Sequence, residues 1–251
     1  MLGKGCRIIK LFYKIIILLK EGMYMKRIIA LISLLAISLS VAACSSTADN
    51  SSDSNEQNET ANIHNPGETV SDWQTALQYL KDGNQRYVDN QTIARDTNTE
   101  DREALKDGQH PFAVIITCSD SRISPEICLD QKLGDIFVIR NAGNITDATT
   151  LGSIEYAVEH LNAPLVVVVG HSSCGAVTAA FNGGEYPSNL QSIVNTISDS
   201  IIGSNDVDEA IHENITSVAE KIKEDTVVEE LETKVIGAYY DIVSGEISWL
   251  D

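Results

Sequence analysis

The sequence predicts an α/β fold with a parallel β-sheet core flanked by helices on both faces. Three observations carry this prediction: short apolar runs, longer segments with apolar residues at helical spacing, and the alternation of the two along the chain. The first three apolar runs carry almost no polar residues, as is typical of strands that are covered on both faces. We expect strands at 111–117, 136–140, 165–169, 234–243 and 246–250.

Helices are expected in the segments around these strands. Trp73, Leu77 and Leu80 repeat at helical spacing, and Gly83 is expected to end that helix. Further helices are expected at 151–161, 176–181, 190–202 and 207–222. Together these elements predict one domain over residues 71–251, which is long enough to bury a core of its own.

Composition and charge exclude several classes of protein. The chain has 251 residues, of which 43% are hydrophobic, too many for a fully disordered chain. Its formal net charge is −18, and the first 43 residues hold seven of the 18 basic residues and one of the 36 acidic ones. The remainder is therefore strongly acidic, which excludes nucleic-acid binding and a polybasic membrane patch. Five cysteines are too few for a disulfide scaffold.

The amino-terminal region has the pattern of an export signal. Met25, Lys26 and Arg27 precede an uncharged apolar run at 28–41, which is shorter than a membrane span. Val-Ala-Ala-Cys at 41–44 resembles the bacterial lipobox, in which the cysteine is acylated and becomes the first mature residue. We therefore interpret 25–43 as a lipoprotein signal peptide and Cys44 as the lipidation site. The alternative is an ordinary signal peptide with an incidental cysteine.

The segments on either side of this signal have different interpretations. We expect translation to start at Met25, so that residues 1–24 do not belong to the natural protein. The alternative is that residues 1–24 form an extra membrane segment. Residues 44–70 are rich in Ser, Asn, Asp, Glu and Thr, and we interpret them as a disordered tether. We therefore expect the folded domain to be an enzyme or a binding domain that lies outside the cytoplasm, anchored to the membrane by a lipid.

Chemically reactive side chains follow two of the expected strands. Cys-Ser-Asp-Ser-Arg at 118–122 follows the first strand, and Gly-His-Ser-Ser-Cys-Gly at 170–175 follows the third. Sites in parallel sheets lie beyond the carboxyl ends of the strands, so both segments belong to one edge. Cys118, His171 and Cys174 supply two thiolates and an imidazole, the donors of a zinc site with one open position.

Less specific interpretations of the same residues stay open at this point. A disulfide between Cys118 and Cys174 is compatible with an exported protein, although it leaves His171 unexplained. Asp120 and Arg122 form either a catalytic pair or a salt bridge that stabilises a turn. Cys128 lies in an expected helix and is interpreted as a buried structural residue.

The two signatures together resemble the β-class carbonic anhydrases. The resemblance extends to the helix at 76–87, to Arg-Asn-Ala-Gly at 140–143 and to the strand at 235–241, and it covers about residues 73–250. It implies the β-carbonic-anhydrase-like fold with an N-terminal helical arm. It also implies a homodimer or higher homo-oligomer, in which the segment 72–88 contacts the partner.

The resemblance further implies a reaction and roles for individual residues. Carbon dioxide and water are converted reversibly to bicarbonate and a proton, through attack by zinc-bound hydroxide. Cys118, His171 and Cys174 would bind one Zn²⁺ per chain, with Asp120 and Arg122 as the catalytic dyad. In some members the aspartate moves onto zinc as a fourth ligand and closes the site, and Asp120 has the position to do so.

Four further residues are candidates for substrate binding or proton transfer, Gln109 and Trp73 from the resemblance and Gly175 and His110 from their positions. Gln109, nine residues before the first cysteine, is expected to contact substrate, and Gly175 to bring backbone N–H groups close to an anion at a helix start. Trp73 is the early tryptophan that a second bicarbonate site would use. His110 is the histidine nearest to the site in sequence and a candidate proton shuttle.

Three other functions compete with the anhydrase. Enzymes of similar fold act on carbonyl sulfide or carbon disulfide with the same ligands, and pocket shape would distinguish them. A non-catalytic zinc-binding module would not need Asp120 and Arg122. A Cys–His hydrolase would need a thiolate free of metal, so one zinc per chain would exclude it.

Overall fold

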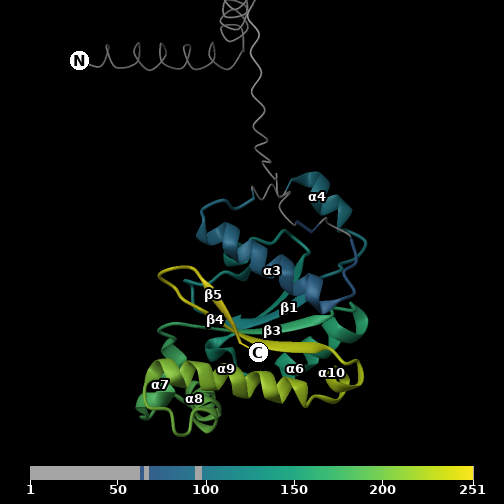
Figure 1. Ribbon diagram of the computed structural model, residues 1–251. Coiled ribbons are helices and arrows are strands. Elements are labelled where there is room, and N and C mark those ends of the chain that lie inside the picture. The colour runs from purple at the N-terminus through teal and green to yellow at the C-terminus, as the bar shows by residue number, and fades with distance from the viewer. Residues whose placement is uncertain (1–62, 65–67, 94–97, 251) are drawn as a thin grey trace, which may run out of the picture. The chain divides into compact units, whose positions relative to one another are not determined.

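The computed structural model describes residues 63–64, 68–93 and 98–250 (Figure 1). Residues 1–24, the predicted signal peptide at 25–43, the predicted lipidation site Cys44 and most of the predicted tether lie outside the described residues. The proposed domain boundaries in that region therefore stay predictions. Among the helices that are described, none combines the length and the apolar character of a membrane span.

A five-stranded sheet forms the centre of the domain, in the order β2-β1-β3-β4-β5. The first four strands are parallel, and β5 pairs antiparallel with β4 through a hairpin. The bounds are β1 Ala113–Cys118, β2 Ile136–Asn141, β3 Leu165–His171, β4 Lys234–Tyr240 and β5 Ile247–Leu250. The predicted parallel-core sheet is confirmed, and every expected strand is present with shifted ends.

Helices cover both faces of the sheet, as predicted. One face carries α3 and the short α5, and the other carries α6 to α10 (Figure 1). The helices are α3 Trp73–Val88, α4 Thr99–Ala104, α5 Pro125–Cys128, α6 Ala148–Glu155, α7 Gly175–Asn182, α8 Ser188–Ser200, α9 Val207–Lys223 and α10 Thr226–Glu230, with a 3-10 turn at Ala142–Asn144 and a π-helical turn at Tyr156–His160. The strands β1 and β3 are buried along their whole length because both faces are covered.

Gly83 does not end α3, in contrast to the prediction, and the helix continues to Val88. The reason is packing: a Cβ at Gly83 would overlap the backbone carbonyl oxygen of Leu129, so glycine permits the close approach of α3 to the segment after α5. A tertiary contact thus explains a glycine that local propensity assigns to a helix end.

Replacing Gly83 by alanine is expected to destabilise the domain by roughly 1–3 kcal/mol, because a backbone carbonyl cannot move aside as a side chain can. Gly152→Ala is the matched control, since Gly152 lies in α6 and a Cβ there meets no atom within 4 Å. That control is expected to add about 0.5–1 kcal/mol of stability. Urea unfolding of both variants measures the two effects, and equal free energies of unfolding would contradict the packing argument.

His64 belongs to the segment that the sequence analysis assigns to the tether, yet it is only 3% exposed. Its ring packs edge-on against Tyr79 and Phe112. Its Nδ1 lies 2.8 Å from Oδ1 of Asp135, and its Nε2 lies 2.8 Å from the carbonyl oxygen of Glu68. The contacts of the domain therefore begin before residue 71.

Both hydrogen-bond partners of His64 are acceptors, so the protonated ring, in which both nitrogens donate, satisfies both contacts. Burial lowers the pKa of His64, but the hydrogen bonds to Asp135 and to the Glu68 carbonyl oxygen, together with the charge of Asp135, outweigh burial and raise the pKa above its usual value. A pKa raised on folding stabilises the fold fully below the unfolded pKa, near 6.5, and this contribution is lost as pH rises through the folded value.

We therefore expect His64→Gln to destabilise the domain more at pH 5.5 than at pH 8.5. Urea unfolding of the wild type and the variant at the two pH values measures the difference. A destabilisation that is equal at both pH values would show that His64 acts through packing alone.

Candidate metal centre

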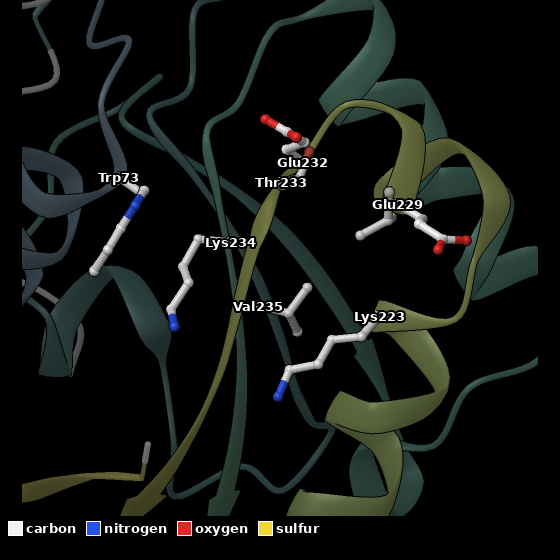
Figure 2. A pocket seen from close by; sticks show the side chains of 8 residues that line it. Trp73, Lys223, Glu229, Glu232, Thr233, Lys234 and Val235 are labelled. Carbon is white, nitrogen blue, oxygen red and sulfur yellow. The ribbon is translucent and has the colours of Figure 1, made fainter.

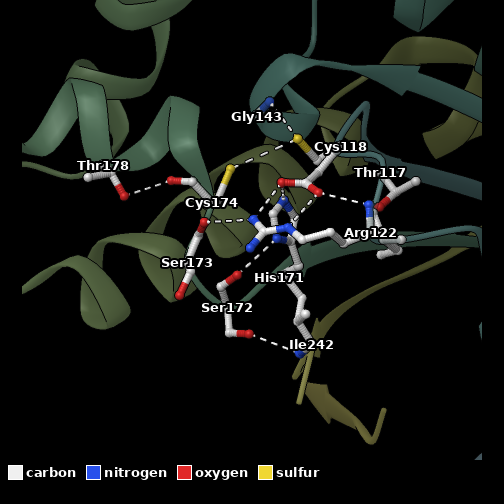
Figure 3. Close-up of polar contacts among 12 residues, drawn as sticks. Thr117, Cys118, Arg122, Gly143, His171, Ser172, Ser173, Cys174, Thr178 and Ile242 are labelled. Atoms are coloured by element: carbon white, nitrogen blue, oxygen red, sulfur yellow. Dashed lines mark hydrogen bonds and ion pairs between the residues drawn. The ribbon is translucent and has the colours of Figure 1, made fainter. Parts of the chain in front are cut away.

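Two cysteines and one histidine meet at the carboxyl edge of the sheet. Cys118 is the last residue of β1, His171 is the last residue of β3, and Cys174 precedes the first turn of α7 (Figure 3). Their ligand atoms all lie within 4.8 Å of one another, and all three residues are buried. The structure therefore brings together the three side chains that the sequence singled out.

The two sulfur atoms are not bonded to each other. They lie 4.0 Å apart and both cysteines are free, which overturns the disulfide alternative. Tetrahedral Zn–S bonds of about 2.3 Å place two sulfurs roughly 3.8 Å apart, close to this separation. His171 Nε2 is fully buried and has no hydrogen-bond partner among the described residues, an arrangement that a metal bond would satisfy. The donor set and its spacing thus fit a zinc ion.

Neighbouring backbone groups orient two of the ligands. The Gly143 N–H donates to Cys118 Sγ at 3.4 Å, and His171 Nδ1 donates to the carbonyl oxygen of Ser172 at 3.0 Å. The second contact fixes the tautomer that leaves Nε2 as the metal-binding atom. Sequence reasoning missed Gly143 as a contact of the site, although Gly143 belongs to the turn at 140–143 that resembles a family motif.

The protonation of the cluster favours a thiolate. The hydrogen bond from Cys174 lowers the pKa of the Cys118 thiol, and His171 lowers it further, against the effect of burial. The pKa of Cys174 is raised by the same contact with Cys118 and by burial. A bound cation would stabilise both sulfurs as thiolates, which is the form in which cysteine binds zinc.

Asp120 and Arg122 form a bidentate ion pair beside the cluster. Arg122 Nε donates to Oδ1 at 2.9 Å and Nη2 donates to Oδ2 at 2.7 Å, while the Arg122 N–H donates to Oδ1 at 2.9 Å. These bonds hold the pKa of Asp120 well below its usual range. Arg122 also donates to the carbonyl oxygen of Ser173 at 3.2 Å, which links the pair to the segment that carries Cys174.

The carboxylate of Asp120 points toward the cluster. Its Oδ2 lies 4.0 Å from Nε2 of His171, although it does not join the group of three ligand atoms. Arg122 engages both oxygens, so the carboxylate is held beside the position that a metal would occupy. In this arrangement Asp120 is available as a hydrogen-bond acceptor.

The other sequence candidates lie in different surroundings. Gln109 is exposed in the loop before β1, and none of the hydrogen bonds among the described residues joins it to the cluster. Gly175 begins α7, and a Cβ there would meet no atom within 4 Å, so the space beside it is open. Cys128 is buried in α5 with its thiol 3.8 Å from the Pro125 carbonyl oxygen, outside the cluster. His110 is exposed.

Trp73 lies at the opposite edge of the sheet. It lines a shallow pocket with Lys223, Glu229, Lys234 and neighbouring residues, at the amino end of β4 (Figure 2). The ammonium of Lys234 lies 5.1 Å from the centre of the indole ring, within the range of a cation–π contact. Because the metal cluster lies at the carboxyl edge, Trp73 takes no part in it.

Comparison with known proteins gives the family. The family profile described as carbonic anhydrase matches residues 113–247. A carbonic anhydrase of Mycolicibacterium smegmatis is 40% identical over 186 residues, which cover 68% of this chain and 90% of that protein. Carbonic anhydrase 2 of Mycobacterium tuberculosis is 46% identical over 131 residues, or 51% of this chain and 63% of that protein.

Solved structures agree with the sequence comparisons. The β-carbonic anhydrase CafA of Aspergillus fumigatus has a TM-score of 0.55 and 31% identity, with 59% of this chain and 79% of that chain covered. A tetrameric β-carbonic anhydrase of Sordaria macrospora has a TM-score of 0.54 and 29% identity, with 59% and 84% covered. With the family profile spanning both halves of the metal cluster, the chain belongs to the β-class carbonic anhydrases.

Proposed function

We propose that the chain catalyses the reversible hydration of carbon dioxide to bicarbonate and a proton at one zinc ion held by Cys118, His171 and Cys174. One observation carries the proposal: three buried zinc-type donors converge beside a carboxylate that a bidentate arginine holds in place. The three ligands and the Asp120–Arg122 ion pair are both needed for this argument, because the three ligands alone would equally suit a structural metal site.

Zinc, when bound, supplies Lewis acidity that brings the pKa of a water molecule near neutrality. Asp120 then accepts a hydrogen bond from the attacking water and turns its lone pair toward the carbon of carbon dioxide. Arg122 keeps this carboxylate ionised and prevents its rotation through two hydrogen bonds. His171 keeps its proton on Nδ1, because the Ser172 carbonyl oxygen accepts it.

The product side of the reaction needs groups that favour an anion. Backbone N–H groups in the first turn of α7, beginning at Gly175, point out of the helix with a positive partial charge. The open space beside Gly175 leaves room for a small anion near Cys174. We retain Gln109 as a substrate contact on the family resemblance alone.

Stopped-flow measurement of carbon dioxide hydration between pH 6.5 and 9, with zinc counted in the same sample, tests the proposal. We expect about one zinc per chain and a rate that rises with pH as the attacking water is deprotonated. Full zinc occupancy without hydration at any pH would contradict it. In that case carbonyl sulfide and carbon disulfide become the substrates to assay, and after them a binding role without turnover.

We further propose that acylated Cys44 anchors the enzyme on the outer side of a bacterial cell membrane. The support is the charged start at 25–27, the apolar run at 28–41 and the small residues before the cysteine. Two or more acyl chains hold a protein stably, whereas one chain is marginal. Detergent-phase partitioning tests the anchor: the wild type is expected in the detergent phase and Cys44→Ser in the aqueous phase.

A homo-oligomer, a dimer or larger, is the assembly that we propose. The Sordaria macrospora relatives are tetrameric, which supports it. Ala76 and Leu80 of α3 are fully buried in the chain's own core, so the opposite side of this helix is the part that a partner can contact. Light scattering after size-exclusion chromatography measures the mass, and a monomer at micromolar concentration would contradict the proposal.

A further inference from the structure

Arg140, near the end of β2, binds the loop that carries the catalytic pair. Its Nε donates to the carbonyl oxygen of Cys118 at 3.1 Å. Its Nη2 donates to the carbonyl oxygens of Asp120 at 2.8 Å and Ile123 at 2.9 Å. The guanidinium of Arg140 thus donates hydrogen bonds to three carbonyl oxygens within a stretch of six residues.

This contact lies where the loop leaves the sheet. The ladder between β1 and β2 ends at the pair Cys118 and Asn141, and the Ser119 N–H donates to the Asn141 carbonyl oxygen at 3.0 Å. Beyond that point, no strand in the described part of the chain pairs with the loop. Its other hydrogen bonds run from the Ile123 N–H to the Asp120 carbonyl oxygen, from Arg122 to the Asp120 carboxylate, and from Arg122 Nη2 to the Ser173 carbonyl oxygen. Arg140 therefore ties the loop to β2, whereas Arg122 ties it to the segment that carries Cys174.

The contact is directional rather than ionic. None of the ion pairs among the described residues includes Arg140, and all three of its acceptors are neutral backbone carbonyls. The side chain is also exposed, so water competes for the same donors and the contribution to global stability is small. The planar fork of an arginine can satisfy carbonyls at several angles at once, which the ammonium group of a lysine cannot match.

We propose that Arg140 is a positioning residue for catalysis, which holds the 118–123 loop so that the Asp120 carboxylate faces the metal site. The inference rests on the proposed roles of Asp120 and Arg122. Asp120 Oδ2 lies only 4.0 Å from His171 Nε2, so a small movement of the loop changes its distance to the reacting water. The ligand Cys118 is less dependent on Arg140, because β1 and the Gly143 N–H also fix it.

Two substitutions test this role in the whole chain with zinc bound. Arg140→Lys keeps the charge but removes the fork, and Arg140→Ala removes both. Arg86→Lys is the matched control, since Arg86 holds Asp130 through a side-chain contact and a backbone carbonyl contact away from the loop. Zinc content, kcat and KM for hydration, and hydrogen exchange of the amides at 119–123 are measured for each.

We expect both Arg140 variants to keep about one zinc per chain and to lose roughly 10–100-fold in kcat, with little change in KM. Exchange of the amides at 119–123 is expected to accelerate, and Arg86→Lys to leave kcat and this exchange unchanged. Unaltered kcat in Arg140→Lys, or zinc lost in proportion to activity, would overturn the inference. If Arg140→Ala does not fold, the lysine variant decides alone.

The exchange measurement separates this inference from the proposed function. A wild-type chain without hydration activity would contradict the function, and the inference about catalysis would fall with it. An active wild type with unchanged exchange in the Arg140 variants would contradict only the positioning role.

Discussion

Replacing Cys174 by serine is expected to remove the zinc ion and to abolish carbon dioxide hydration. A serine hydroxyl is not ionised near neutral pH and is a poor zinc ligand, so Cys118 and His171 would remain as the only two donors of the cluster. Without the metal no group in the site lowers the pKa of water, and we expect the rate to fall by more than about 10³-fold. Zinc content and stopped-flow hydration of the variant measure both effects.

Cys128→Ser is the matched control for this substitution. Cys128 is as deeply buried as Cys174, and its thiol already lies near the Pro125 carbonyl oxygen, which a serine hydroxyl can also use. We expect this variant to keep its zinc and its activity. A Cys174→Ser protein that still holds one zinc per chain would refute the ligand set, whatever its activity.

The positions of the strands could be predicted because the signal was local. The run at 165–169 is apolar at every position, and its short length and its valines favour a strand covered on both faces over a buried helix. The cluster followed from the same reasoning, since parallel strands end at one edge and Cys118 and His171 end two neighbouring strands. The choice between a metal site and a disulfide needed the distance between the two sulfurs, which no sequence pattern gives.

The features that sequence reasoning missed depend on contacts between distant segments. Gly83 remains inside a helix because a carbonyl 46 positions later in the chain, that of Leu129, packs against it. His64 is buried through a hydrogen bond to Asp135, 71 residues away, although its neighbours have the composition of a tether. The contacts of Arg140 depend on the curvature of a loop. Spacing and hydropathy carry no information on any of these.

Asp120→Asn is expected to keep zinc and to lose most of the activity, by roughly 10²–10⁴-fold. The amide has the shape of the carboxylate, but one oxygen becomes an NH₂ group that cannot accept a hydrogen bond from water. It also cannot satisfy both donors of Arg122, so the side chain loses its orientation. Asp135→Asn is the control: it removes a carboxylate that binds His64 before β2, and it should affect stability but not hydration.

The outcome of Asp120→Asn distinguishes three roles of this carboxylate. Normal zinc content with low kcat indicates a residue that orients the reacting water, as proposed, whereas a change in zinc affinity would indicate a fourth ligand in the resting enzyme. Full activity would indicate that the Asp120–Arg122 ion pair is only a salt bridge that stabilises a turn. If Arg140 acts through Asp120, the double variant Asp120→Asn with Arg140→Lys should have the same kcat as Asp120→Asn alone. In both variants there is no carboxylate left for Arg140 to orient.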